Sequence, residues 1–226
     1  MVTRRLVALA GTAGVVALGA WILPAPAVAA TGGGLCQLAG NAAFSPGLGS
    51  TAQDFTYNFS GTLSGCQSSD ASAPQSGTVE AGVTRTVSYD WTYTDSTGTH
   101  SGTASATYQE PVPTGNGSCA RSTTSGISIA GWSDGTSTVV SYSTTGVAAA
   151  VDLTGSVVPS ATLTLLSYTG PTQAPPGSTY TISTTRWSGD SAAGALTFQP
   201  PDPTQCSSGG VTSALISGGI GLGSAT

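Results

Sequence analysis

A strict two-residue alternation between residues 84 and 94 constrains this chain more than any other feature. Threonine, serine and aspartate alternate there with larger side chains, which are Arg85, Val87, Tyr89, Trp91 and Tyr93. Only a β-strand places alternate residues on opposite faces. The alternation therefore predicts a strand with one packed face of large side chains and one solvated face that is rich in hydroxyl groups.

The first 30 residues have the order of a signal peptide. Arg4 and Arg5 precede an apolar stretch over residues 6–23, and small residues follow up to Ala29 and Ala30. This order is typical of a secretory signal. We therefore expect cleavage near Ala29 or Ala30 and a secreted, extracellular protein with no stable membrane insertion after cleavage. The alternative is an uncleaved anchor, because the apolar stretch approaches the length that spans a bilayer.

The charge composition argues against nucleic acid as a partner. Charged residues make up 7% of the chain, against about 25% in average proteins, and lysine is absent. The formal net charge is −5, and cleavage of the signal peptide would also remove Arg4 and Arg5. Phosphate binding requires clustered lysine and arginine. Serine, threonine and glycine keep the surface hydrated instead, which suits a secreted protein.

Four cysteines follow the expected cleavage site: Cys36, Cys66, Cys119 and Cys206. An even number in an oxidising compartment predicts two disulfides. Of the three pairings we expect Cys36 with Cys66 and Cys119 with Cys206. The other two would tie the halves of the chain together across the Pro/Gly-rich segment 111–117.

Short alternating segments separated by Gly, Pro and Asp turns make up the rest of the chain. Residues 83–110 predict one hairpin, and Asp134-Gly135 predicts the turn of another. No long segment after residue 30 has helical periodicity. About ten or eleven strands therefore predict a single all-β domain over 31–226, with a seam at 111–117. We expect an antiparallel two-sheet sandwich, immunoglobulin-like or jelly-roll-like, or a flattened barrel, preceded by the signal-peptide helix.

The turn and cysteine motifs resemble those of secreted actinobacterial β-rich proteins with two disulfides. The motifs are Phe44-Ser45-Pro46-Gly47-Leu48 after Cys36, Phe59-Ser60-Gly61-Thr62-Leu63-Ser64-Gly65-Cys66, Trp132-x-Asp134-Gly135, and Gly209-Gly210-Val211-Thr212-Ser213-Ala214 after Cys206. The resemblance covers most of the chain after the signal peptide. It implies export, turns and disulfides, and no active-site residue carries over from it.

One motif resembles the nucleophile loop of chymotrypsin-like serine proteases. In Gly189-Asp190-Ser191-Ala192-Ala193-Gly194, Ser191 would be the nucleophile, His100 the base, and Asp134 or Asp152 its orienting carboxylate. Alanines replace both glycines that should follow the serine, and no cysteines flank either site. We therefore interpret the motif as a polar turn and keep a degenerate trypsin-like serine hydrolase as a remote alternative.

No catalytic, cofactor or metal site is expected. One histidine and paired cysteines exclude the usual zinc sets, and the aspartates are too scattered for a calcium loop, although a surface calcium ion stays open. Glu80 and Glu110 could form the carboxylate pair of a glycoside hydrolase. Nothing in the sequence brings these two together, and we expect two exposed, solitary carboxylates.

The aromatic face of residues 84–94 is the feature that points to binding. Flat rings such as Tyr89, Trp91 and Tyr93 stack on sugar faces in many carbohydrate-binding modules, but the same rings also suit a sandwich core. Trp187 beside Arg186 carries the same ambiguity. We expect a secreted, non-enzymatic, disulfide-stabilised protein with a binding or cell-surface structural role. The alternative is a module that binds cell-wall or environmental polysaccharide through these four rings.

Overall fold

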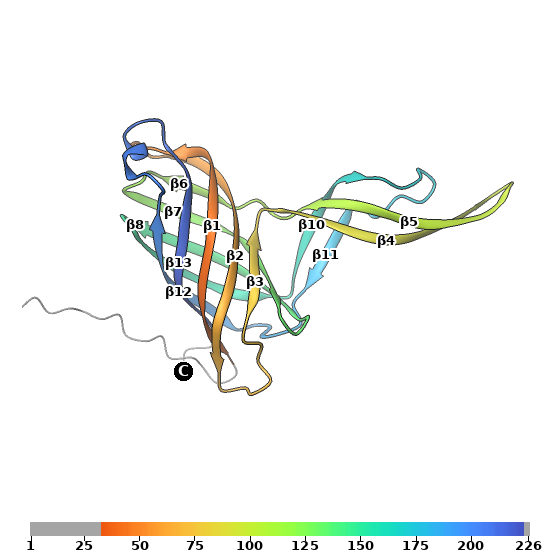
Figure 1. The fold of residues 1–226 in the computed structure, drawn as a ribbon, viewed down its shortest axis with the longest axis horizontal. Coiled ribbons are helices and arrows are strands. Elements are labelled where there is room, and N and C mark those ends of the chain that lie inside the picture. The colour runs from red at the N-terminus through yellow and green to blue at the C-terminus, as the bar shows by residue number, and fades with distance from the viewer. Residues whose placement is uncertain (1–32, 224–226) are drawn as a thin grey trace, which may run out of the picture.

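The computed structural model describes residues 33–223, and strands dominate this range, which confirms the predicted all-β class (Figure 1). The expected signal peptide lies outside the described residues. The strands are β1 (Gly34–Leu48), β2 (Gln53–Ser68), β3 (Gly77–Ala81), β4 (Thr84–Asp95), β5 (Gly98–Gln109), β6 (Thr114–Gly117), β7 (Arg121–Trp132), β8 (Ser137–Val147), β9 (Ala150–Val158), β10 (Ser160–Tyr168), β11 (Thr179–Ser183), β12 (Ser191–Gln199) and β13 (Val211–Leu222). A 3-10 turn, η1 (Pro203–Cys206), precedes β13. Nowhere in residues 33–223 does a helix have the length and apolar character needed to cross a bilayer.

The strands are more numerous than the ten or eleven expected. Alternate residues from Val147 to Val157 have the period of a single strand, but β8 ends at Val147 and β9 begins at Ala150. The turn between them contains Ala148 with a positive φ of 53°. Alanine is uncommon in that conformation. Residues 147–150 also contain no Gly, Pro or Asp, the residue types that would indicate a turn.

The larger sheet closes on itself. Its order is β1-β13-β12-β9-β8-β7-β3-β2-β6, and an additional ladder pairs β1 with β2. Leaving β6 aside, eight antiparallel strands thus form a closed barrel (Figure 1). Of the two architectures expected, a sandwich would leave two open sheets facing each other, whereas a flattened barrel has a closed wall like this one. Closure depends on β1, which pairs with β13 near the end of the chain and with β2 beside it.

One position in the barrel wall is shared by two short strands. β3 joins β2 to β7 toward one end of the barrel, and β6 joins the same two strands toward the other end. Between β3 and β6 the chain leaves the wall and forms the long hairpin of β4 and β5. Residues 111–117, expected as a seam, bring the chain back into the wall through β6.

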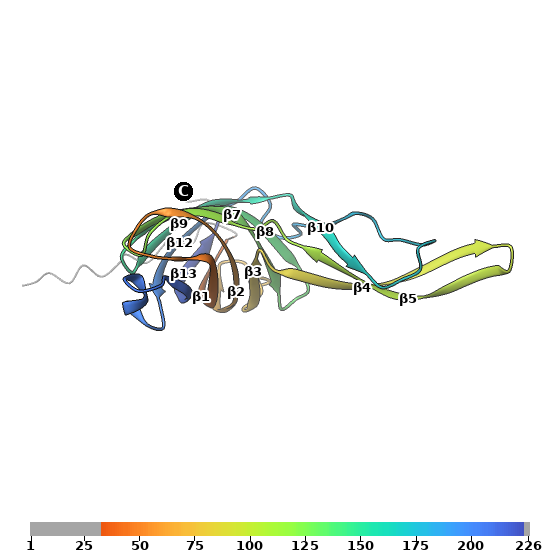
Figure 2. The same ribbon diagram turned by 90° about the horizontal axis from the view of Figure 1, so that it is seen from above.

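The second sheet has four strands in the order β11-β10-β5-β4. Its basal part packs against the outside of the barrel, where Ile129 of β7 and Val139 of β8 meet Ala106, Tyr108 and Leu163. A sandwich-like layer therefore covers one side of the barrel. Beyond that layer, β4 and β5 continue as a two-stranded ribbon that projects far from the barrel (Figures 1 and 2). We call residues 84–109 the arm.

The barrel interior is apolar, and a disulfide lies toward each end. Cys36–Cys66 joins β1 to β2 in the main core cluster, and Cys119–Cys206 packs beside Leu48, Phe55 and Val211. These are the two pairs that the sequence led us to expect. The bridges fix opposite ends of the same closed wall.

Candidate binding sites

The arm is a regular antiparallel hairpin, and no other strand of the described part of the chain pairs with its outer part. Its register runs without interruption from Thr84 opposite Gln109 to Asp95 opposite Gly98, which confirms the predicted hairpin. β10 pairs with β5 only as far as Ala106, and Thr169 then bonds to the backbone of Ser105. Past this point both edges of the ribbon are open (Figure 2).

Aromatic side chains follow one another along one face of the arm. Trp91 stacks on Tyr93 with ring centroids 5.5 Å apart, and Tyr93 stacks on His100 at 4.9 Å. Nearer the barrel, Tyr89 stacks on Tyr168 at 5.6 Å. All of these side chains on β4 and β5 are partly exposed. The structure thus places the three predicted ring residues of β4 on the arm and adds His100 beside Tyr93. We call Trp91, Tyr93 and His100 the aromatic strip.

The register of the hairpin explains why His100 belongs to the aromatic strip. A hairpin that turns at residues 95–98 places residue 100 directly opposite residue 93, which is the observed register. Cross-strand neighbours on one face interact. Gly102 has a similar role opposite Trp91, because a Cβ there would lie 2.8 Å from the indole ring. The missing side chain lets Trp91 lie over the neighbouring strand.

The other face of the arm carries hydroxyl groups, as predicted. Thr86 and Thr107 form one cross-strand hydroxyl pair at 3.2 Å, and Thr94 and Thr99 form another at 3.1 Å. At the tip, the Asp95 carboxylate accepts hydrogen bonds from the backbone N–H and hydroxyl of Thr97, which lower the pKa of Asp95. The ribbon is therefore strongly two-sided, with rings on one face and hydroxyls on the other.

The arm is tied to the barrel by an ionic cluster that the sequence did not reveal. Arg85 binds Glu80 of β3 at 2.8 Å and also binds Glu110, whose side chain is 1% exposed. The expectation of two solitary, exposed glutamates is therefore wrong. Glu80 lies near the end of β3 and Glu110 directly follows β5, so the two ends of the arm bring these carboxylates together. Burial raises the pKa of Glu110, and the Arg85 guanidinium opposes that rise.

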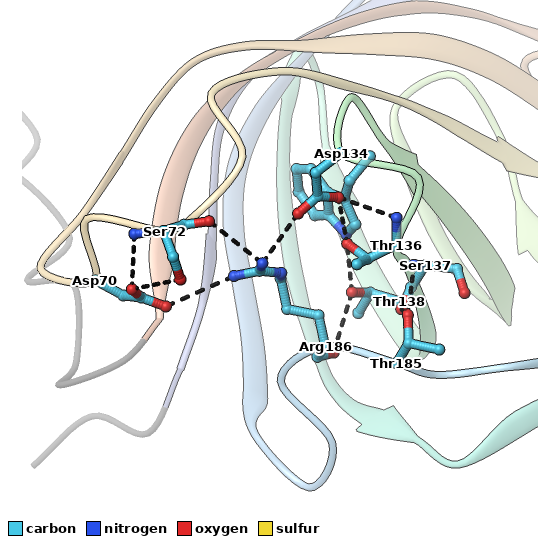
Figure 3. A network of polar contacts seen from close by, with 9 residues as sticks. Asp70, Ser72, Asp134, Thr136, Ser137, Thr138, Thr185 and Arg186 are labelled. Carbon is cyan, nitrogen blue, oxygen red and sulfur yellow. Dashed lines mark hydrogen bonds and ion pairs between the residues drawn. The ribbon is translucent and has the colours of Figure 1, made fainter.

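Trp187, the fourth predicted platform residue, lies away from the arm at one end of the barrel. Its ring meets Trp132 edge to face at 4.9 Å and packs against the main core cluster. Beside it, Arg186 binds Asp134 at 2.9 Å and Asp70 at 3.6 Å, and donates to the carbonyl of Ser72 (Figure 3). This network joins three loops at the barrel end.

The residues of the serine-hydrolase alternative are not brought together. Ser191 begins β12 in the barrel wall, where its hydroxyl donates to the carbonyl of Gly223. His100 lies on the arm, where its Nε2 is 3.2 Å from Asp95. Asp134 binds Arg186, and Asp152 sits in β9. The polar-turn interpretation of Gly189–Ser191 agrees with the turn that Gly189 makes at a φ of 85°.

Four of the aspartates that are too scattered for a calcium loop stabilise turns. Asp70, Asp95, Asp134 and Asp202 each accept the backbone N–H and the hydroxyl of a serine or threonine two residues later. These bonds lower the pKa of each aspartate. Within residues 33–223 no group of three or more His, Cys, Asp or Glu side chains has the arrangement of a metal site.

A small apolar cavity of about 120 Å³ lies inside the barrel. Phenylalanines and aliphatic side chains line most of it, and one wall carries a chain of hydroxyls. Tyr57 and Tyr142 are hydrogen-bonded at 2.6 Å, and Thr124 joins Tyr57 at 3.1 Å and Thr144 at 2.7 Å. Burial raises the pKa of both tyrosines. The volume is below the roughly 300 Å³ at which small-molecule pockets begin, so we interpret the interior as core.

Comparison of the chain with protein-family models, curated proteins and solved structures gives no match in any of the three. The candidate site therefore stands on its own geometry, which is a row of partly exposed, mutually stacked rings on a projecting ribbon.

Proposed function

We propose that this is a secreted, non-enzymatic protein that acts by binding, and that its barrel is a rigid base for the arm. The signal-like N-terminus and the two disulfides support export. The observation that carries the proposal is the aromatic strip, which lies on a two-stranded ribbon beyond the barrel. Partly exposed rings on a projecting element are typical of a recognition surface.

The chemistry of the arm favours an uncharged polysaccharide as the ligand. Rings stack on the apolar faces of sugars, and a tryptophan and a tyrosine in line along a strand suit successive sugar units. Charged residues are few in the whole chain, and Asp90 is on the hydroxyl face, opposite the rings. A cell-wall or environmental polysaccharide therefore fits the strip better than an anionic polymer does.

Retention on insoluble chitin, cellulose and peptidoglycan tests this function. We expect the protein to be retained on at least one polymer, and Trp91→Ala to weaken retention roughly 2- to 13-fold, because a lost aromatic stack costs about 0.5–1.5 kcal/mol. The matched control is Tyr180→Ala, which removes a 39% exposed ring from β11 of the same sheet. The control should bind as the unmodified protein does.

Three results would contradict this proposal. Absence of retention on all three polymers would remove the polysaccharide ligand, and equal weakening by both alanine variants would show that the strip is not the surface involved. Covalent labelling of Ser191 by a fluorophosphonate probe would contradict the non-enzymatic role. The folded state of each variant is checked by circular dichroism before binding is measured.

A further inference from the structure

β4 is the outermost strand of the four-stranded sheet, and within residues 33–223 no strand pairs with its outer edge. The hydrogen-bond pattern identifies the groups on that edge. Glu110 donates its backbone N–H to Val83, and the register then alternates, so odd-numbered residues of β4 bond to β5. The N–H and C=O groups of Thr84, Thr86, Ser88, Asp90, Thr92 and Thr94 therefore point away from the hairpin.

Natural sheets protect such edges with charged side chains, prolines, bulges, short strands or a covering segment. β4 is 12 residues long, contains no proline and pairs with β5 without a register shift. Its charges are Arg85, which binds Glu80 and Glu110 at the base, Asp90 in the middle and Asp95 at the tip. A two-stranded ribbon is also marginally stable alone in water. Both considerations indicate that this edge is built to receive another strand.

We propose that the edge of β4 pairs with the edge of β4 in a second copy of this chain, in antiparallel orientation about a two-fold axis. A two-fold interface needs a surface that complements itself. The β4 edge complements itself, because the N–H and C=O groups of its even-numbered residues can bond to the same groups of a second, antiparallel copy. Pairing even with even also places the two hydroxyl faces on one side and the two aromatic faces on the other.

Charge selects the register within this arrangement. An axis through Asp90 would place that carboxylate directly opposite its own copy, and like charges in that position are destabilising. An axis through Tyr89 pairs residues 84–94 with their copies, which is the longest overlap that avoids this. Asp90 then faces Ser88 of the second copy, and Val87 faces Trp91 of the second copy. The four-stranded sheets join into one continuous sheet with the two aromatic faces side by side.

Light scattering during size-exclusion chromatography, without any polysaccharide, tests the pairing. We expect the purified protein to have twice the monomer mass, and Thr92→Pro to weaken dimerisation at least about tenfold, because proline removes an N–H from the outer edge of β4. Ser101→Pro is the matched control. Ser101 of β5 lies directly opposite Thr92 and on the same face of the hairpin. Its N–H points away from β4, so proline at residue 101, like proline at residue 92, breaks no hydrogen bond within the hairpin. This control should remain a dimer.

Single cysteines test the register under mild oxidation. We expect Tyr89→Cys to form an intermolecular disulfide, because residues on the axis form a close pair, whereas Asp90→Cys should cross-link poorly. A monomeric protein at all concentrations would overturn the proposal, as would equal loss of the dimer in both proline variants. Preferential cross-linking of Asp90→Cys would overturn the register. Because dimerisation is measured without polymer, its failure is separate from a failure of polysaccharide binding.

Discussion

The barrel and the arm use the same alternating strands, but they bury them differently. In the barrel the inward residues meet other inward residues across a closed wall, so that Leu38, Leu63 and Val157 are each at most 5% exposed. In the outer arm the large residues have only one another to pack against, and they stay partly exposed. The same pattern gives a core where a sheet closes and a surface where a ribbon projects. Substitutions in the barrel should therefore change mainly the free energy of unfolding, and substitutions in the outer arm should change mainly binding.

Removal of the disulfides should give the largest effect, and it should fall on the barrel. On the loop-entropy model, a bridge closing 87 residues contributes about 4.5 kcal/mol and one closing 30 residues about 3.5 kcal/mol. We expect Cys119→Ala with Cys206→Ala to lower the free energy of unfolding more than Cys36→Ala with Cys66→Ala. Urea denaturation measures both. A larger loss of stability without Cys36–Cys66 than without Cys119–Cys206 would show that the length of the closed loop does not set the contribution of each bridge.

The next effect tests the junction between arm and barrel. Arg85→Met leaves Glu110 buried without its cation, and loss of one partner of a buried ion pair costs about 3 kcal/mol. Arg186→Met is the control, because its partners Asp70 and Asp134 are 41% and 32% exposed, and exposed pairs contribute about 1 kcal/mol or less. Thermal unfolding compares the two variants. Equal losses would mean that the Arg85 cluster does not anchor the arm.

The smallest effect compares two glycines that lie under aromatic rings. A Cβ on Gly61 in the barrel would lie 2.7 Å from the Phe59 ring and 2.9 Å from the carbonyl oxygen of Ala39. A Cβ on Gly102 in the arm would lie 2.8 Å from the Trp91 ring.

We expect Gly61→Ala to cost about 1–3 kcal/mol, because a packed core cannot move aside. Gly102→Ala should cost less than about 1 kcal/mol and shift the tryptophan emission, because Trp91 can swing outward. Urea denaturation followed by fluorescence measures both changes. A large loss of stability in Gly102→Ala would show that the arm is packed as tightly as the barrel.

Much of the local structure could be predicted from the sequence because it depends on neighbours in the chain. The hairpin of residues 83–110 and the turn at Asp134-Gly135 follow from alternation and turn chemistry. The two faces of β4 also follow from its period of two. The turn at Ala148 was missed because alanine there adopts a conformation that its own preference does not signal.

The residues of the candidate site could be predicted from the sequence, but whether they lie in the core or on the surface could not. Tyr89, Trp91 and Tyr93 stood out in the sequence, but a core and a surface need the same rings. Trp187 was grouped with them and lies instead against Trp132 at a barrel end. The Arg85 cluster was missed because Glu80 and Glu110 meet only after the arm between them has folded back.

The sequence alone determined the period of the strands and the hydroxyl-rich face of β4, since both are properties of short segments. It also determined the even number of cysteines, which is a matter of composition. The tertiary structure decided that β1 closes the wall with both β2 and β13, and that β3 and β6 share one place in it. Those pairings join residues far apart in the chain, and local periodicity carries no information about them. The projection of the arm follows from them, because its two ends are fixed where β3 leaves the wall and β6 returns.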